Sequence, residues 1–157
     1  MTLAPHPRHA VMALALLVLT GCASAPRPAE PEVIAERAAR YALEMKGKPY
    51  RYGGSSPRVG FDCSGLVHYS YARAGANVAR TTDALYRSSR RIRTAHLRPG
   101  DLLFFNQEGK RASHVGIYLG GKRFVHAPSG GKRVSVASLA QPYWRRHLES
   151  ARRLVLD

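Results

Sequence analysis

The apolar residues of this chain change their spacing once, around Pro99-Gly100, and this change limits the folds that the chain can adopt. Before this point the spacing is helical and predicts helices over residues 33–47, 63–74 and 82–89. After it, short apolar runs predict strands over residues 101–106, 114–119, 123–127, 133–136 and 151–156, with a helical turn at Tyr143-Trp144. Helices followed by strands joined through tight turns indicate an α+β fold with an antiparallel sheet. With 157 residues, 45% of them apolar, the chain is long enough for one such domain and too short for two.

The first 21 residues have the composition of an export signal. Arg8 and the amino terminus supply positive charge, and the apolar run from Ala10 to Leu19 is shorter than the roughly 20 residues that a membrane-spanning helix needs. The run ends in Leu19-Thr20-Gly21-Cys22, which resembles the lipobox of bacterial lipoproteins, where the cysteine becomes the acylated first residue. The alternatives are an ordinary secretory signal with a chance cysteine, or a buried helix.

Two features of the next segment extend the lipoprotein prediction. Ala23 rather than an aspartate follows Cys22, and in Gram-negative lipoproteins this implies passage to the outer membrane. Residues 22–32 contain Pro26, Pro28 and Pro31 among alanines and charges, which predicts an extended linker. The folded domain is then expected to occupy residues 33–157.

Cys63 opens the second predicted helix and has the position of a nucleophile. The sequence contains two cysteines, so acylation of Cys22 leaves Cys63 without an intramolecular partner in an oxidising compartment. Asp62 is placed to cap this helix, and the helix N-terminus is expected to lower the pKa of the Cys63 thiol. Backbone N–H groups of the same turn are positioned to face the oxyanion that forms when a thiolate attacks an amide carbonyl. The alternative is a buried, inert cysteine.

Two histidines lie on the predicted hairpin across Gly120-Gly121. His114 and His126 are six and five residues from these glycines, so we expect them near-opposite each other with both side chains on one face of the sheet. With Cys63 they supply a thiol, a base and a residue that orients the base, which is the pattern of a cysteine hydrolase. Two structural histidines are the alternative. Zinc binding by the three residues is chemically possible, but no fourth ligand lies at close spacing, so we expect neither a metal nor another cofactor.

The charge balance is strongly basic, since 25 Lys and Arg residues against 10 Asp and Glu residues give a formal net charge of +15. The arginines are densest over residues 87–98 and 145–153. They form either a solvated surface or one that attracts the domain to an anionic polymer. No helix-turn-helix, zinc-finger or aromatic ribonucleoprotein motif accompanies the charge, so a cell-wall or lipid phosphate is the expected polymer and nucleic acid is not an expected partner.

Six blocks of the sequence resemble, in order, those of the NlpC family of cell-wall peptidases, and the resemblance covers about residues 33–156. The blocks are Tyr50-Arg51-Tyr52-Gly53-Gly54, Gly60-Phe61-Asp62-Cys63-Ser64-Gly65-Leu66-Val67, Arg80-Thr81-Thr82, Leu97-Arg98-Pro99-Gly100-Asp101-Leu102, Ser113-His114-Val115-Gly116-Ile117-Tyr118 and Phe124-Val125-His126-Ala127. The resemblance implies a papain-like α+β fold. It also implies cleavage of peptidoglycan stem peptides, usually between D-glutamate and the diamino acid that follows.

The resemblance also implies roles for individual residues. By it, Cys63 is the nucleophile, His114 the base and His126 the third, orienting residue. It further implies that Tyr50 contacts the oxyanion or the substrate, and that two more residues line the substrate cleft, Asp62 and Ser64.

The resemblance has one departure, at Leu85, where family members often carry glutamine, and this predicts an altered pocket. The complete prediction is a monomeric outer-membrane lipoprotein, held at the membrane through a lipid on Cys22, with a papain-like domain that faces the periplasm and acts on peptidoglycan. Two alternatives stay open: an amidase or acyltransferase on the same fold, and a non-catalytic wall-binding lipoprotein. The complete Cys-His-His set argues against the second.

Overall fold

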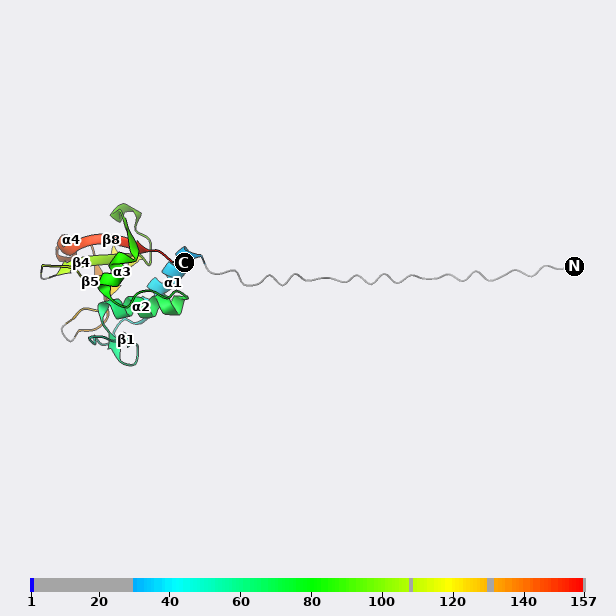
Figure 1. Ribbon diagram of the computed structural model, residues 1–157, viewed down its shortest axis with the longest axis horizontal. Helices are drawn as coiled ribbons and strands as arrows, with labels where there is room; N and C mark the ends of the chain where they lie inside the picture. Colours follow the sequence, from blue (N-terminus) through cyan, green and yellow to red (C-terminus); the bar gives the residue numbers. More distant parts are fainter. Residues whose placement is uncertain (2–29, 108, 130–131, 157) are drawn as a thin grey trace.

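The folded part of the chain begins with a proline, which suits the first turn of a helix because an N–H group there has no intrahelical partner. This residue opens helix α1 (Pro31–Glu44), two residues before the predicted start of the domain. The computed structural model describes residue 1 and residues 30–107, 109–129 and 132–156 (Figure 1). The predicted acylated residue, Cys22, and almost all of the export signal and linker lie outside the described residues. Within these ranges, no helix is long and apolar enough to cross a membrane.

The other helices follow the predicted pattern closely. Helix α2 (Cys63–Ala74) has the predicted bounds, and it ends at Gly75, which adopts the left-handed conformation with φ 104°. Helix α3 (Thr82–Arg87) ends two residues earlier than predicted. A 3₁₀ turn, η1 (Thr94–His96), and a short helix, α4 (Pro142–His147), complete the set.

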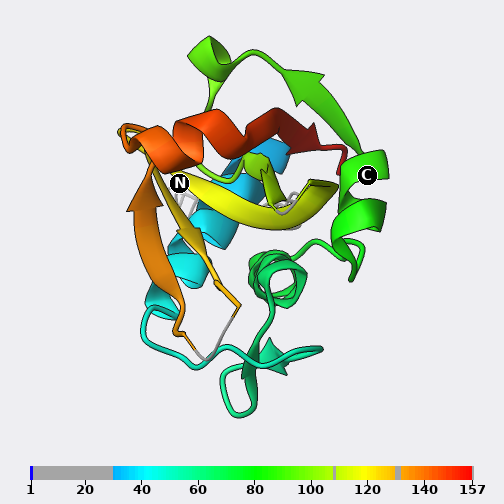
Figure 2. The same cartoon turned by 90° about the vertical axis from the view of Figure 1, so that its left-hand side faces the viewer.

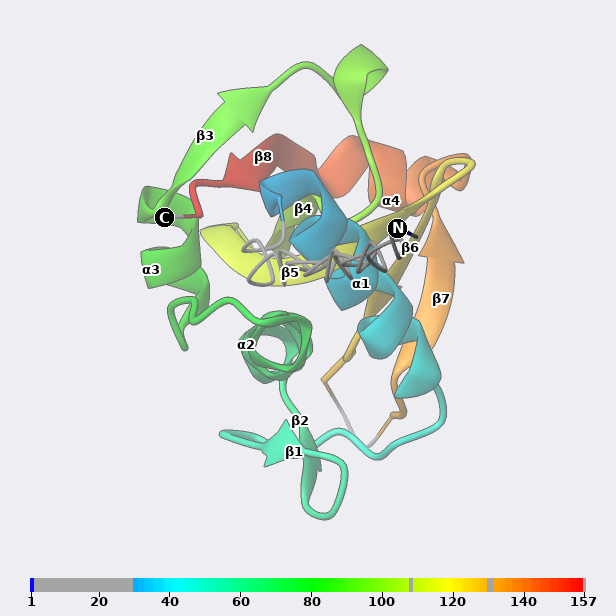
Figure 3. The same cartoon turned by 90° about the vertical axis from the view of Figure 1, so that its right-hand side faces the viewer.

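Six strands form one antiparallel sheet in the order β3-β8-β4-β5-β6-β7. Their bounds are β3 (Ser89–Ile92), β4 (Leu102–Gln107), β5 (Lys110–Gly120), β6 (Arg123–His126), β7 (Ser135–Ser138) and β8 (Leu148–Leu154), and a separate pair is formed by β1 (Ser55–Ser56) and β2 (Gly60–Phe61). Strands β3 and β7 lie at the two edges of the sheet (Figure 3). The predicted α+β architecture with an antiparallel sheet is therefore confirmed.

Strand β3 was not predicted, because its residues are polar or charged at three of four positions. Arg90 and Arg91 are exposed, and they pair in register with Arg153 and Arg152 of β8. Part of the strong basic charge therefore lies on an edge strand, where charged side chains hinder pairing with the edge of another molecule.

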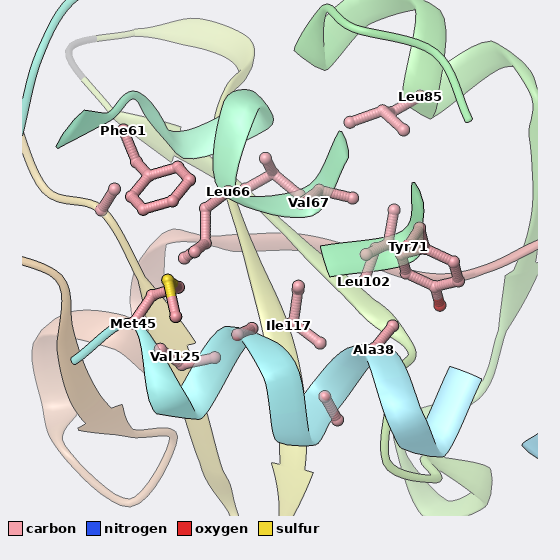
Figure 4. Packing of buried hydrophobic residues seen from close by; sticks show 14 of the residues in the cluster. Ala38, Met45, Phe61, Leu66, Val67, Tyr71, Leu85, Leu102, Ile117 and Val125 are labelled. Carbon is pink, nitrogen blue, oxygen red and sulfur yellow. The ribbon is translucent and has the colours of Figure 1, made fainter. Parts of the chain in front are cut away.

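The sheet has an apolar core on each face. On one face α1 and α2 pack against the central strands (Figure 3), and the side chains of Leu66, Ile117 and Val125 meet between them (Figure 4). On the other face α4 packs on β4 and completes a second, mainly aromatic cluster. Leu85 is fully buried in the first core. A side chain without exposed surface does not line a pocket itself, and that this residue alters the pocket stays a prediction.

The start of α2 is held against the preceding loop by a close backbone contact. A Cβ atom on Gly65 would lie 2.0 Å from the carbonyl oxygen of Gly54 and 2.8 Å from Oδ1 of Asp62. The backbone N–H of Asp62 donates to the same Gly54 carbonyl at 3.0 Å. Figure 2 shows α2 end-on beside the β1–β2 pair that carries this loop. The position of Cys63 therefore depends on an approach that only glycine permits.

Gly65→Ala should lower the free energy of unfolding by about 3 kcal/mol, because the added methyl group has to displace backbone atoms. Ser70→Ala in the same helix is the matched control. The Ser70 hydroxyl is buried and has no hydrogen-bond partner among the described residues, so its removal should leave stability unchanged or raise it by about 1 kcal/mol. Urea denaturation followed by circular dichroism measures both, and wild-type stability in Gly65→Ala would contradict the contact.

Candidate active site

Cys63 is the first residue of α2, and one carboxylate fixes the turn that presents it. Asp62 caps the helix as predicted, since its Oδ1 accepts a hydrogen bond from the Gly65 N–H at 2.6 Å. Its Oδ2 accepts from the Gly53 N–H at 2.9 Å. The Arg80 guanidinium donates to both oxygens, each at 2.9 Å. A single side chain therefore joins the helix start to the loop before it and to the segment that leads into α3.

Ser64 belongs to the same network. Its side chain is 6% exposed, and its hydroxyl donates to Asp62 Oδ1 at 3.3 Å and accepts from Arg80 at 3.1 Å. These contacts give Asp62 and Ser64 a structural role at the start of α2. That they also line a substrate cleft stays a prediction.

Cys63 is partly buried. Its Sγ lies 3.6 Å from Oγ1 of Thr82, and the backbone of Val115 and of Ser64 is near enough to affect its pKa. Burial raises the pKa of the Cys63 thiol above its ordinary value, and it outweighs the effect of these three polar neighbours, each of which lowers it. The predicted lowering of this pKa is therefore wrong, because the sequence indicates the helix terminus but not the burial of the sulfur.

The two histidines meet on one face of the sheet, as predicted. Nε2 of His114 lies 2.9 Å from Nδ1 of His126, and the two residues are 5% and 4% exposed. The ladder between β5 and β6 ends at Ile117 and Val125, and its register places Gly116 across from His126. The histidines are therefore diagonal neighbours rather than opposite ones, and the Phe124 ring packs over Gly116, where a Cβ atom would lie 2.7 Å from Cδ2 of Phe124.

A hydrogen-bond chain continues beyond the pair to a residue that sequence reasoning missed. Nε2 of His126 lies 3.3 Å from Oγ of Ser135 on β7. When Nδ1 of His114 is free to take a proton, Nε2 of His114 carries the ring hydrogen and donates it to Nδ1 of His126. Nε2 of His126 then carries a hydrogen as well and donates it to the Ser135 hydroxyl. The Ser135 hydroxyl can accept this hydrogen bond, so the chain is compatible with the tautomers that leave Nδ1 of His114 free to act as a base.

Both imidazoles are neutral at neutral pH. Burial lowers the pKa of His114 to about 3, with a further contribution from His126. Burial also lowers the pKa of His126 to about 4, and the positive charge of Lys132 adds to this effect. Because the pKa of Cys63 is raised, the resting site holds a thiol and two neutral rings. Within residues 30–107, 109–129 and 132–156, no three His, Cys, Asp or Glu side chains are grouped closely enough to hold a metal ion.

Three aromatic side chains, Trp144, Phe105 and Phe124, pack against the histidine pair, and we call them the aromatic cover. Trp144 of α4 stacks on His114 with ring centroids 6.1 Å apart and meets His126 edge-on at 4.8 Å. Phe105 and Phe124 pack against the same rings, at 6.1 Å from His114 and 5.3 Å from His126. The sequence predicted only a helical turn at Trp144, since nothing in the local pattern indicates which strand residues this side chain meets.

Tyr50 lies beside the thiol. Burial raises the pKa of its hydroxyl, and negative charge on Cys63 and Asp62 raises it further, so the three groups are within electrostatic reach of one another. The Tyr50 N–H donates to the carbonyl of Lys132 at 2.8 Å, which ties it to the segment between β6 and β7. Its role as an oxyanion or substrate contact stays a prediction.

These site residues fall within the part of the chain that matches a known family. The model of the NlpC/P60 family matches residues 47–153. The chain belongs to the NlpC/P60 family. Murein DD-endopeptidase MepH of Escherichia coli K12 is 44% identical over 117 residues, which cover 72% of this chain and 43% of that protein. Bifunctional muramidase/DL-endopeptidase CwlT of Bacillus subtilis 168 is 40% identical over 121 residues, which cover 76% of this chain and 36% of CwlT. The NlpC/P60 chain therefore spans less than half the length of these two relatives.

Solved NlpC/P60 structures share the fold. An NLP/P60 family protein from Staphylococcus aureus Mu50, described as similar to lipoprotein, has a TM-score of 0.70 at 34% identity and covers 85% of this chain and 45% of that one. The P60 domain of a Mycobacterium avium subspecies paratuberculosis antigen has a TM-score of 0.66 at 26% identity, covering 81% and 98%. The predicted papain-like architecture is therefore confirmed.

In this NlpC/P60 domain Cys63 should react slowly with iodoacetamide at pH 6, because a thiol with a raised pKa is almost fully protonated there. The rate should rise about tenfold per pH unit until the pH exceeds 9. Thr82→Val should slow the reaction at each pH, since it removes a hydrogen bond that lowers the pKa. Rapid alkylation that does not vary between pH 6 and 8 would instead reveal a thiolate and contradict the resting state described above.

His126→Asn should retain more hydrolytic activity than His126→Ala, because an amide side chain can still accept a hydrogen bond from Nε2 of His114. His114→Ala should lose nearly all activity. Circular dichroism of each variant checks that it is folded. If the three folded NlpC/P60 variants turn over substrate at the same rate, the two histidines are structural.

Proposed function

We propose that the domain is a peptidoglycan endopeptidase that cleaves stem-peptide or crosslink amide bonds with Cys63 as nucleophile. One observation carries the proposal: the thiol at the start of α2 lies near the backbone of Val115, the residue after His114, and the His114 ring is hydrogen-bonded to His126. The relatives MepH and CwlT, named as DD- and DL-endopeptidases, support the same class of reaction.

The first step in the proposed reaction is a proton transfer between two neutral groups. As Sγ of Cys63 attacks the carbonyl carbon of the amide, Nδ1 of His114 takes the thiol proton. His126 accepts a hydrogen bond from Nε2 of the resulting imidazolium and so stabilises its charge. The aromatic cover around Trp144 limits access of water, which strengthens these interactions.

The oxyanion formed in this attack requires hydrogen-bond donors near Cys63. The Cys63 N–H has no backbone acceptor among the described residues, and it lies at the positive end of α2. The Tyr50 hydroxyl, within electrostatic reach of the thiol, is the second donor in this proposal. A well-placed donor of this kind contributes roughly 3 to 4 kcal/mol to transition-state stabilisation.

Three proton transfers complete the cycle. Protonated His114 gives its proton to the leaving nitrogen as the C–N bond breaks, which frees an amine and leaves a thioester on Cys63. His114 then removes a proton from a water molecule that attacks the thioester carbonyl. The C–S bond breaks, the thiol regains that proton, and a carboxylic acid product leaves.

Digestion of purified muropeptides should yield new amino groups and shortened or separated stem peptides. Mass spectrometry should find the sugar-proximal residues of the stem still attached to the glycan. Cys63→Ser should reduce the rate at least about a thousandfold. Stem peptides released whole from the glycan would indicate the amidase alternative and contradict the endopeptidase proposal, and the absence of any product would contradict both.

We also propose that a lipid on Cys22 holds the domain at the outer membrane, on its periplasmic side. The lipobox-like residues before Cys22 support this, as does the description of the staphylococcal structural relative as similar to lipoprotein. Helix α1 begins nine residues after Cys22. An extended segment of that length would hold the domain within about 30 Å of the membrane surface.

Cys22→Ser should abolish labelling by a radioactive or clickable fatty acid and release the protein from the membrane fraction, because the residue that would carry the lipid is gone. Cys63→Ser is the matched control and should be labelled like the wild type. A Cys22→Ser protein that is still labelled and membrane-bound would exclude this lipid site.

A further inference from the structure

A cavity of about 600 Å³ lies beside the histidine pair, and none of the proposed catalytic steps uses it. Its wall includes His114, His126, Trp144, Ser135 and Lys132. Neither Cys63 nor any other residue of α2 is among the described residues that line it.

The position of this cavity indicates which half of the substrate it can hold. The carbonyl half has to reach Sγ of Cys63 and the N-terminus of α2. The amine half has to lie beside His114, which gives the leaving nitrogen its proton. A cavity lined by both histidines and by no residue of α2 therefore lies on the amine side of the scissile bond.

The chemistry of the wall suits a single anionic group. Lys132 is the only charged side chain among the described residues that line the cavity, and the other polar groups are amides, hydroxyls and the two histidines. Its ammonium group is close enough to lower the pKa of His126. Its main chain is held in place because its carbonyl accepts the Tyr50 N–H at 2.8 Å. Its side chain is exposed, and an ammonium group that lies among neutral donors is complementary to a carboxylate.

We infer that this cavity binds the amine half of the substrate, and that Lys132 pairs there with a free carboxylate on the residue that supplies the amine. The inference rests on the proposed endopeptidase function and specifies its substrate. In a diaminopimelate crosslink, the carbon that bears the scissile nitrogen also bears a free carboxylate. In the D-glutamyl-diaminopimelate bond of a tetrapeptide stem, the corresponding carboxyl group is part of the next peptide bond. Carboxylate recognition therefore favours the crosslink as the preferred bond.

A matched pair of crosslinked muropeptide dimers tests this inference. One dimer carries the free carboxylate beside the scissile nitrogen, and the other carries a carboxamide at the same carbon. Each is given to the wild type, to Lys132→Gln, to Lys132→Arg and to Lys46→Gln, a control at an exposed lysine that does not line the cavity. The ratio kcat/KM is measured for every combination.

For the wild type and Lys46→Gln, amidation should lower kcat/KM about tenfold, since a hydrogen bond to a charged group is lost. Lys132→Gln should lose about tenfold on the carboxylate dimer and nothing further on the amidated dimer, whereas Lys132→Arg should retain most activity. Equal losses on both dimers, or a wild type that is indifferent to amidation, would overturn the inference while the endopeptidase function stands. A wild type that cleaves neither dimer nor any uncrosslinked stem would contradict the proposed function itself.

Discussion

The carboxylate of Asp62 is the interaction on which the rest of the site depends. Its two oxygens accept from the N–H groups of Gly53 and Gly65 and from the Arg80 guanidinium, so the loop before α2, the start of α2 and the segment before α3 meet at one side chain. The helix that carries Cys63 cannot shift relative to the loop before it without breaking a charge-assisted hydrogen bond, and such bonds are stronger than neutral ones. The start of α2 is thereby fixed within the short, partly irregular N-terminal half. The histidines of the sheet can then take a defined position relative to Cys63.

Burial, rather than charge, sets the resting state of the site. The low exposure of His114 and His126 and the enclosure of the Cys63 sulfur all favour the uncharged forms of these groups. A neutral thiol is a poor nucleophile and also resists oxidation. In the proposed reaction, charge separation arises only together with the attack on a bound amide, when His126 already accepts a hydrogen bond from the developing imidazolium.

Local patterns predicted most of the architecture, because the apolar period of α2 reflects burial on one face and the apolar runs of β4 and β5 reflect burial on both faces of the sheet. Local patterns did not predict the features that depend on tertiary contacts. Strand β3 lacks an apolar pattern because it is an edge strand rich in arginine. The contacts of Trp144 with the histidines, and the hydrogen bond from His126 to Ser135, join elements whose proximity depends on sheet order. The direction of the Cys63 pKa depends on how deeply the sulfur is enclosed, which no local spacing reveals.

The place of β8 in the sheet determines when the sheet can be completed during synthesis of the chain. This strand follows all the other described strands in the sequence, yet it lies between β3 and β4 and pairs with both. A chain that emerges end-first, from a ribosome or through a membrane pore, cannot close this sheet until its last strand is free. Contacts between such distant segments also slow folding, because a long loop has to be closed first. The six-stranded sheet is therefore completed only after the rest of the described chain has become available, and until then the edges of β3 and β4 that pair with β8 stay uncovered.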